Sequence, residues 1–309
     1  MEYKGKVITA RAPLRLSFAG GGSDTVEFSE KHEGAVLSTT IARYVTVRGW
    51  WSNPNKPWAL QSYPSYEADN DFLDKLSFLF SSQIRRPFHP ERFAGFESYC
   101  DAPLRSGLGA SGALSVAGMA CLAHLQGKSD TPRILAMHAY GFERDKLFIM
   151  GGQQDQYAAA FGGLNLMEFR DRDVQATKIE LLPSTLLDIE TSLLLVFIHS
   201  RQFPSHEVMS TEIIRVTKGD PQVIGALKNQ ARLAHEMNHA LSIRDLVSFG
   251  YMLDEAWHWK KLQSPGVTND VVDDCLQEIN YYKTESDTLR AFSKFIGNNI
   301  YDIITGWFS

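Results

Sequence analysis

Residues 106–114 read "SGLGASGAL" and join an expected strand to a helix built from small and apolar residues. Gly107 and Gly109 lack Cβ atoms, so their backbone N–H groups can come close to an anion. A helix that begins near Ser111 would direct its free N–H groups and the positive end of its dipole to the same place. The stretch therefore predicts a phosphate site, although a plain glycine turn with a serine N-cap fits the spacing equally well.

The composition is that of a globular, soluble protein. The chain has 309 residues, 44% of them hydrophobic and 22% charged, which is enough for one large domain or two with a well-buried core. The net charge of -5 offers no general attraction to nucleic acid or to an anionic membrane, and we expect neither as a partner. Three widely spaced cysteines, Cys100, Cys121 and Cys275, are typical of free thiols in a reducing cytosol, so we expect a cytoplasmic protein.

The order of the expected elements favours the α+β class. Strands and helices are mixed without the regular alternation of a doubly wound fold. We place a soft domain boundary shortly after the charged segment 170–178, which is typical of a hairpin or a connection. The periodicity predicts strands near 6–18, 35–51, 92–100, 164–169 and 192–199, and helices near 70–81, 111–125, 133–148, 221–242 and 244–262.

A second glycine-rich segment, "GGGSD" at residues 20–24, must form a tight loop. Arg15 lies a few residues before this loop and Asp24 closes it. A carboxylate accepts hydrogen bonds from hydroxyl groups, so the segment can hold a polyhydroxy ligand. A surface turn explains the segment equally well.

A third segment, "GGQQDQYAAAFGG" at 151–163, places one carboxylate, Asp155, in an otherwise apolar glycine frame. A carboxylate in this setting is either a helix cap or a positioned general base. Glu143 lies twelve residues earlier on a helix that reads as half-buried. It can complete a metal site, although a solvated helix face beside Arg144 is the simpler explanation.

Residues 235–239 read "HEMNH", a formal match to the zinc-protease pattern H-E-x-x-H. His235 and His239 share a helix face with charged residues, while the apolar residues occupy the other side. No third ligand follows at a suitable spacing. The pattern therefore predicts two histidines that project into solvent.

Taken together, "RAPLRLSFAGGGSD", "DAPLRSGLGASGAL" and "GGQQDQYAAAFGG", in this order, resemble the GHMP small-molecule kinases. The first and third motifs are most similar to the branch of D-glycero-D-manno-heptose 7-phosphate kinases, and the resemblance covers residues 7–279. It implies a ribosomal-protein-S5-like, ATP-binding N-terminal domain over 1–185. It also implies a ferredoxin-like C-terminal domain over 186–309.

The resemblance further implies an ATP- and Mg²⁺-dependent kinase whose partner is a small-molecule sugar phosphate. The expected reaction is phosphorylation of a hydroxyl of a sugar or sugar phosphate, in particular the anomeric hydroxyl of D-glycero-D-manno-heptose 7-phosphate. The oligomeric state stays open. Asp155 would be the catalytic carboxylate, held ionised by Arg15, and Mg²⁺ would bind Ser111 and Glu143. The ATP phosphates would be wrapped by Ser106, Gly107, Leu108, Gly109, Ala110 and Ser111, and the acceptor by Gly21, Gly22, Asp24 and Gly152.

The segment after residue 279 departs from the family pattern. The family carries a third motif of the form G-A-G-G-G-G there, whereas this chain has only the isolated Gly297 and Gly306. A divergent, a truncated and a frame-shifted tail all remain open, and the C-terminal domain can be incomplete. The alternative hypothesis is therefore a catalytically impaired homologue that binds nucleotide or sugar phosphate without turnover.

Overall fold

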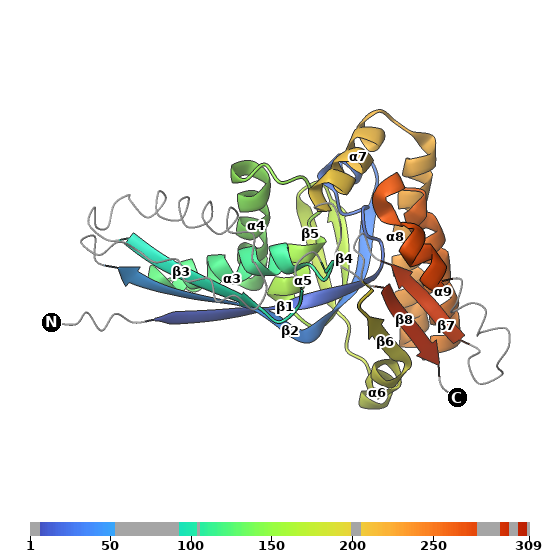
Figure 1. Cartoon of the computed structure of the whole chain (residues 1–309), viewed down its shortest axis with the longest axis horizontal. Coiled ribbons are helices and arrows are strands. Elements are labelled where there is room, and N and C mark those ends of the chain that lie inside the picture. The colour runs from blue at the N-terminus through green and yellow to red at the C-terminus, as the bar shows by residue number, and fades with distance from the viewer. Residues whose placement is uncertain are drawn as a thin grey trace.

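The structure is a computed structural model that describes residues 7–52, 93–103, 106–198, 205–276, 291–296 and 302–307. The helix expected near 70–81 lies outside the described residues, as does much of the tail after 279. The described strands form two sheets, and all of their pairings are antiparallel. Helices pack around both sheets (Figure 1). The α+β class is therefore confirmed.

The larger sheet has five strands and centres on the longest of them, β2. β1 runs along one side of β2, while β4 and β3 pair with the first and second halves of its other side. From Leu14 onward nearly every residue of β1 is buried, because α3, α5, α8 and α9 all contact this strand. The strands are β1 (Ile8–Ala19), β2 (Gly34–Ser52), β3 (Phe93–Cys100), β4 (Leu164–Arg170) and β5 (Asp173–Lys178).

The N-terminal helices lie close to the expected positions, with one correction. The helix predicted over 133–148 ends at Gly141 and is followed by a π-helical turn, η1, which carries Glu143. Thr131 caps its start by accepting a hydrogen bond from the Ile134 N–H, at 3.4 Å. These elements are α1 (Val26–Ser29), α3 (Ala110–Leu125), α4 (Pro132–Gly141), η1 (Phe142–Lys146) and α5 (Gln154–Phe161).

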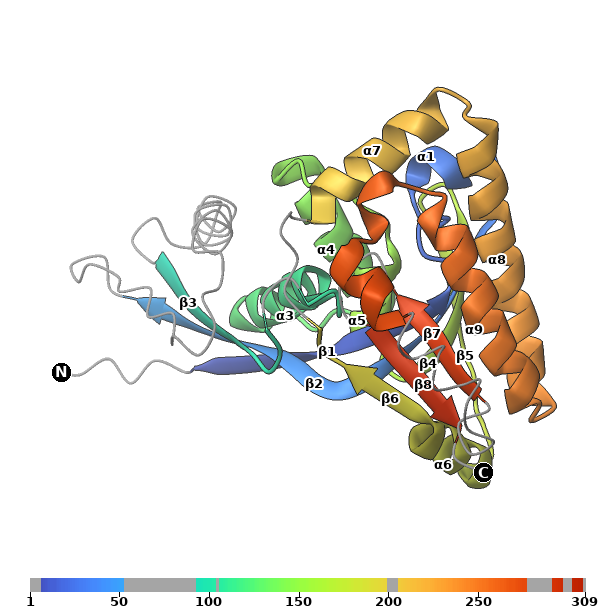
Figure 2. The same cartoon turned by 45° about the vertical axis from the view of Figure 1, so that its right-hand side comes forward.

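The C-terminal elements add three long helices and the smaller sheet. α8 has the predicted bounds because Asp220 caps its first turn and Pro221 opens it. Figure 2 shows α1, which follows the glycine loop at 20–24, lying against α7. The elements are α6 (Pro183–Ser192), β6 (Leu193–Val196), α7 (Ser205–Thr217), α8 (Pro221–Ser242), α9 (Leu246–Lys261), η2 (Pro265–Val267), β7 (Ala291–Ile296) and β8 (Asp302–Trp307), and the sheet order is β6-β8-β7.

The two histidines of the "HEMNH" segment are exposed on α8, and Met237 between them is fully buried. They therefore project into solvent, as the pattern predicts. In the described parts of the chain, no group of three or more His, Cys, Asp or Glu side chains is placed to hold a metal ion. Among the same residues, no helix is long and apolar enough to cross a membrane.

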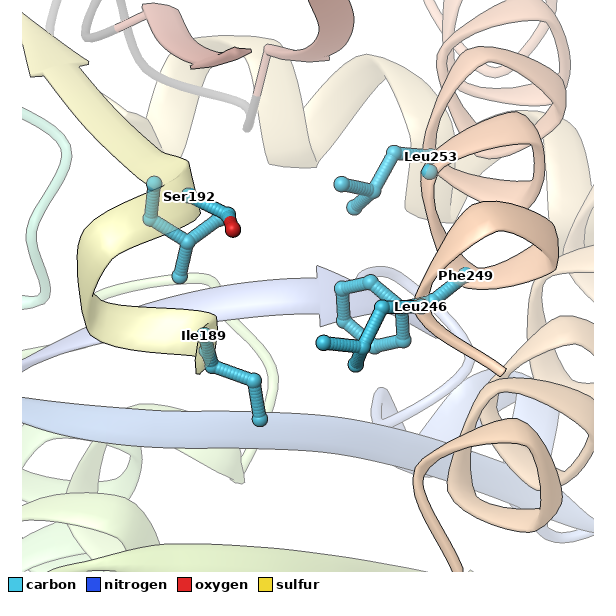
Figure 3. Close-up of a pocket in the computed structure, with 7 residues that line it drawn as sticks. Ile189, Ser192, Leu246, Phe249 and Leu253 are labelled. Carbon is cyan, nitrogen blue, oxygen red and sulfur yellow. The ribbon is translucent and has the colours of Figure 1, made fainter. Parts of the chain in front are cut away.

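A small apolar pocket lies where α6 and β6 meet α9 (Figure 3). Ile189, Leu246, Phe249 and Leu253 are among the residues that line it. Its volume of about 20 Å³ is room for little more than one water molecule. We interpret it as incomplete packing between these elements.

Candidate active site

The glycine turn at 106–109 leads directly into α3. Gly107 and Gly109 have φ angles of +82° and +73°, which is backbone geometry that residues with a Cβ adopt only at a cost. The turn is held by Arg15, whose guanidinium donates to the Gly107 carbonyl at 2.6 Å and whose backbone N–H donates to the Leu108 carbonyl at 3.0 Å. Ser111 is exposed in the first turn of α3. The N–H groups of that turn have no partner within the helix and are suited to an anion.

The same arginine joins this turn to Asp155 in the first turn of α5. Both Nε and Nη2 of Arg15 donate to Oδ1 of Asp155, at 2.8 and 2.5 Å. A Cβ atom on Gly112 would lie 2.6 Å from the Asp155 Cβ, so the glycine allows α5 to approach α3. The Asp155 side chain keeps 26% of its surface exposed, against 10% for Arg15. The carboxylate is therefore held in place and still open to a ligand.

The loop at 20–24 reaches the same short segment through Asp24. The carboxylate of this fully buried residue accepts hydrogen bonds from the Gly22 N–H at 2.8 Å and from the Gln154 N–H at 2.9 Å. Burial raises the pKa of Asp24, while these two backbone hydrogen bonds lower it. Gly152 has no room for a Cβ because the Asp24 carboxylate occupies that place. Asp24 therefore joins the loop to the segment that carries Asp155 and has no exposed surface for a direct contact with a ligand.

Glu143 lies in η1 and is almost fully buried. Burial raises its pKa from 4.5 to about 7, and the nearby charge of Asp155 also raises it, while the side chains of Ser115 and Gln156 lower it. Its Oε1 atom and the Ser115 hydroxyl have no hydrogen-bond partner among the described residues. An unpartnered carboxylate oxygen in such a place is costly unless a proton or a cation satisfies it.

Comparison with known proteins places these features in a family. The model of the GHMP kinases N-terminal domain matches residues 80–163. A D-glycero-alpha-D-manno-heptose 7-phosphate kinase of Campylobacter jejuni is 31% identical over 281 residues, which cover 86% of this chain and 80% of that protein. The chain belongs to the GHMP kinase family.

Solved structures of GHMP kinases share the fold of this chain. A D-glycero-D-manno-heptose 1-phosphate kinase from Bacteriodes thetaiotaomicron superposes with a TM-score of 0.68 at 22% identity, over 97% of this chain and 88% of that one. The L. major mevalonate kinase, solved with R-mevalonate, gives a TM-score of 0.70 at 14% identity, over 97% and 87% of the two chains. At these identities the likeness concerns the fold alone.

The residues that the family resemblance predicts to hold a divalent cation are Glu143 and Ser111. Mg²⁺ prefers oxygen ligands and usually keeps several waters beside one or two carboxylates and substrate phosphates. The unpartnered Oε1 of Glu143 fits such an ion, because a cation would satisfy this oxygen and favour the ionised form. Ser111 supplies an exposed hydroxyl at the helix start.

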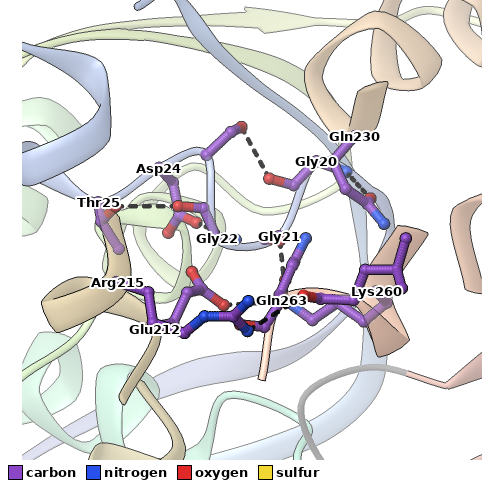
Figure 4. Close-up of polar contacts among 12 residues, drawn as sticks. Gly20, Gly21, Gly22, Asp24, Thr25, Glu212, Arg215, Gln230, Lys260 and Gln263 are labelled. Atoms are coloured by element: carbon purple, nitrogen blue, oxygen red, sulfur yellow. Dashed lines mark hydrogen bonds and ion pairs between the residues drawn. The ribbon is translucent and has the colours of Figure 1, made fainter. Parts of the chain in front are cut away.

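Sequence reasoning missed a second set of polar residues, which lies beside the loop at 20–24 (Figure 4). Lys260 of α9 donates from Nζ to the Gly21 carbonyl at 2.9 Å. Gln230 of α8 accepts from the Gly20 N–H at 2.9 Å. The only sequence signal was a lysine on the apolar face of α9, three residues after the buried Trp257. A lysine buried on such a face needs a hydrogen-bond or charge partner, but the helical periodicity does not predict which residue this partner is.

Proposed function

We propose that this protein is an ATP- and Mg²⁺-dependent kinase that phosphorylates the anomeric hydroxyl of D-glycero-D-manno-heptose 7-phosphate. The observation that carries the proposal is the position of Asp155. It packs against Gly112 in the first turn of α3, while its neighbour Gln154 donates to Asp24 of the loop at 20–24. One short segment therefore brings a carboxylate between a phosphate-binding helix start and a second glycine loop. Phosphoryl transfer needs this alignment more than covalent help from the protein.

The side chains around Asp155 would have different roles in the reaction. Arg15 binds only Oδ1 of Asp155, which leaves Oδ2 to take the proton from the acceptor hydroxyl. Arg15 also brings positive charge next to the glycine turn, where the phosphates of ATP would lie against the first N–H groups of α3. Mg²⁺, held by Glu143 and Ser111 when bound, would neutralise charge on the transferred phosphate.

We propose the S5-like domain over 1–185 and the ferredoxin-like domain over 186–309. The larger sheet ends with β5 at Lys178, and the smaller sheet begins with β6 at Leu193, which supports a boundary between them. The smaller sheet contains β7 and β8 from the divergent tail. The free cysteines among the described residues agree with a reducing, cytoplasmic location.

The acceptor can be decided by an ADP-release assay. The two heptose-phosphate kinases above differ in the phosphate position that their names give, so the panel should contain heptose 7-phosphate, heptose 1-phosphate, galactose and fucose, each with and without Mg²⁺. We expect Mg²⁺-dependent ADP release with heptose 7-phosphate above the rate with water. Release with a different acceptor would correct the substrate.

The alternative, a catalytically impaired homologue, rests on the missing glycine-rich motif after residue 279. It predicts nucleotide binding with no ADP release for any acceptor. The intact Arg15–Asp155 contact supports the active enzyme, because binding alone does not need a positioned base.

A further inference from the structure

A group of buried polar side chains from the C-terminal helices lies against the loop at 20–24, which we call the acceptor loop. Glu212 of α7 and Gln263 after α9 are fully buried, and Lys260 is 5% exposed. Lys260 Nζ contacts the Gly21 carbonyl and the Gln263 side chain, and lies 3.9 Å from Oε2 of Glu212. Figure 4 shows these side chains converging on the loop from the C-terminal elements.

Glu212 is an unusual residue for this position. Both of its carboxylate oxygens are buried without a hydrogen-bond partner among the described residues. A Cβ on Gly22 would lie 2.5 Å from Oε1, so the carboxylate lies directly against the loop backbone. The charged groups that face it are Lys260 from α9, Asp24 from the loop and Arg215 from its own helix.

Stability alone is a poor reason for this arrangement. Replacing a buried ion pair with apolar residues of similar volume is often neutral or stabilising. Glu212 lacks even the hydrogen bonds that usually offset the burial of a charge. The pair does, however, fix one point of the acceptor loop, the carbonyl of the half-buried Gly21.

The loop needs such support because its backbone is unusual. Gly20 and Gly22 have φ angles of +97° and +101°, and glycine is the residue that loses most conformational freedom when it is ordered. Gly21 lies between them, and a Cβ there would come within 3.4 Å of Gln154 Nε2 and 3.7 Å of Lys260 Nζ. The Lys260 contact therefore orders the loop beside the segment that carries Asp155.

We propose that Lys260 and Glu212 are positioning residues for the acceptor sugar, with Lys260 holding the Gly21 carbonyl and Glu212 orienting Lys260. The proposal rests on the proposed function and adds to it that the C-terminal helices control acceptor binding. The ligand group at this loop is a sugar hydroxyl, because Lys260 is buried and its ammonium group already donates to the Gly21 carbonyl and the Gln263 side chain, which leaves it poorly placed to bind a phosphate.

The test uses a double variant, Glu212→Leu with Lys260→Met, in the full chain. Lys260→Met alone would bury the Glu212 carboxylate without its cation and can unfold the protein, whereas the double variant removes both charges. Lys260→Arg is the conservative variant. Arg232→Gln is the matched control, because Arg232 joins α8 to Glu255 of α9 on the exposed surface.

We expect the double variant to raise the KM for the acceptor about tenfold, the effect of losing one hydrogen bond from a charged donor. The KM for ATP should not change. Lys260→Arg, which keeps the cation beside Glu212, should retain part of the acceptor affinity that the double variant loses, and Arg232→Gln should change neither constant. An unchanged acceptor KM in a folded double variant, or an equal rise of both constants, overturns the proposal.

Hydrogen exchange supplies a readout that needs no substrate. The amides of Gly20 and Gly22 donate to Gln230 and Asp24, and they should exchange faster in the double variant, while the amides of α3 should not. Unchanged exchange at the loop overturns the proposal. If the wild-type protein phosphorylates no acceptor, the proposed function fails, and the exchange rates alone decide whether the pair holds the loop.

Discussion

Two glycine loops are connected to the segment that carries Asp155, one through Arg15 and the other through Asp24, and they are held from different parts of the chain. The turn at 106–109 is held by Arg15 of β1, which also binds Asp155. The acceptor loop at 20–24 is held by Lys260 and Gln230, which follow its glycines by 239 and 210 residues. Both loops contain glycines with positive φ angles, so the backbone geometry alone does not distinguish them.

The difference indicates which part of the reaction depends on which part of the protein. Arg15, which binds both the turn at 106–109 and Asp155, comes from the N-terminal strand β1. The acceptor loop needs the C-terminal helices, which lead into the tail that departs from the family pattern. We therefore expect changes in the C-terminal part to alter acceptor binding before they alter nucleotide binding.

The largest expected effect comes from Asp155→Asn, which changes the segment to which both loops are connected. The amide keeps the shape of the carboxylate but cannot take the acceptor proton, so kcat should fall about 10²–10⁴-fold. Steady-state kinetics and ATP binding by calorimetry measure the two properties separately, and ATP binding should survive. Asp173→Asn, an exposed partner of Arg133, is the control. An equal loss of ATP affinity in Asp155→Asn would remove Asp155 from the role of base.

Gly109→Ala tests the proposed nucleotide side, and a change in kcat through Arg15 does not affect the comparison of the two KM values. Its Cβ would lie 3.1 Å from Arg15 Cγ at a φ of +73°, so the KM for ATP should rise while the acceptor KM does not. Gly127→Ala is the matched control, with a φ of +72° and nothing within 4 Å of the added Cβ. Both variants should lose about 1–2 kcal/mol of stability from the left-handed backbone. The same ATP KM in both variants would contradict a nucleotide role for this turn.

For the residues around the acceptor loop, we predict that the stability of the protein depends on pH through Glu212. Burial raises the pKa of Glu212 from 4.5 to about 7, although Lys260 opposes the shift. An acid whose pKa is raised on folding stabilises the protein fully below its unfolded value and loses that contribution as the pH rises through the folded value. Relative to Glu212→Gln, the wild-type free energy of unfolding should fall by on the order of 3 kcal/mol between pH 5 and pH 8.

Urea unfolding at several pH values measures this difference. Glu236→Gln on the exposed side of α8 is the control and should run parallel to the wild type. If the free energy of unfolding changes with pH in the same way in the wild type and in Glu212→Gln, the carboxylate of Glu212 stays ionised throughout this pH range.

The smallest expected effect belongs to His235 and His239. Both side chains are exposed, so replacing either with Ala should change the free energy of unfolding by no more than about 0.5 kcal/mol. Kinase activity should not change, and metal analysis of the purified protein should find no stoichiometric zinc. Bound zinc that is lost in both variants would restore the metal-site interpretation.

The sequence predicted a helix or strand well where capping residues and periodicity both marked its bounds. The bounds of α8 match because a capping aspartate, a proline and an amphipathic repeat all agree. The helix predicted over 133–148 divides at Gly141, where a π-helical turn begins, because a helical pattern over so few residues does not specify α- or π-type hydrogen bonding. The three glycine motifs also led to Arg15 and Asp155, which the structure brings into contact, while their roles stay predictions.

The sequence by itself determined the two glycine loops and the strand and helices around them, because these depend on backbone preferences and periodicities over a few residues. The family followed from the resemblance of three ordered motifs and from the relative that is 31% identical. Only the tertiary structure decided that Asp24 is buried inside its own loop and that Lys260 reaches Gly21. Contacts between residues more than two hundred positions apart depend on how helices pack against a sheet. The packing of the helices on the sheet decides which buried polar groups come into contact, and a sequence pattern over a few residues cannot predict these contacts.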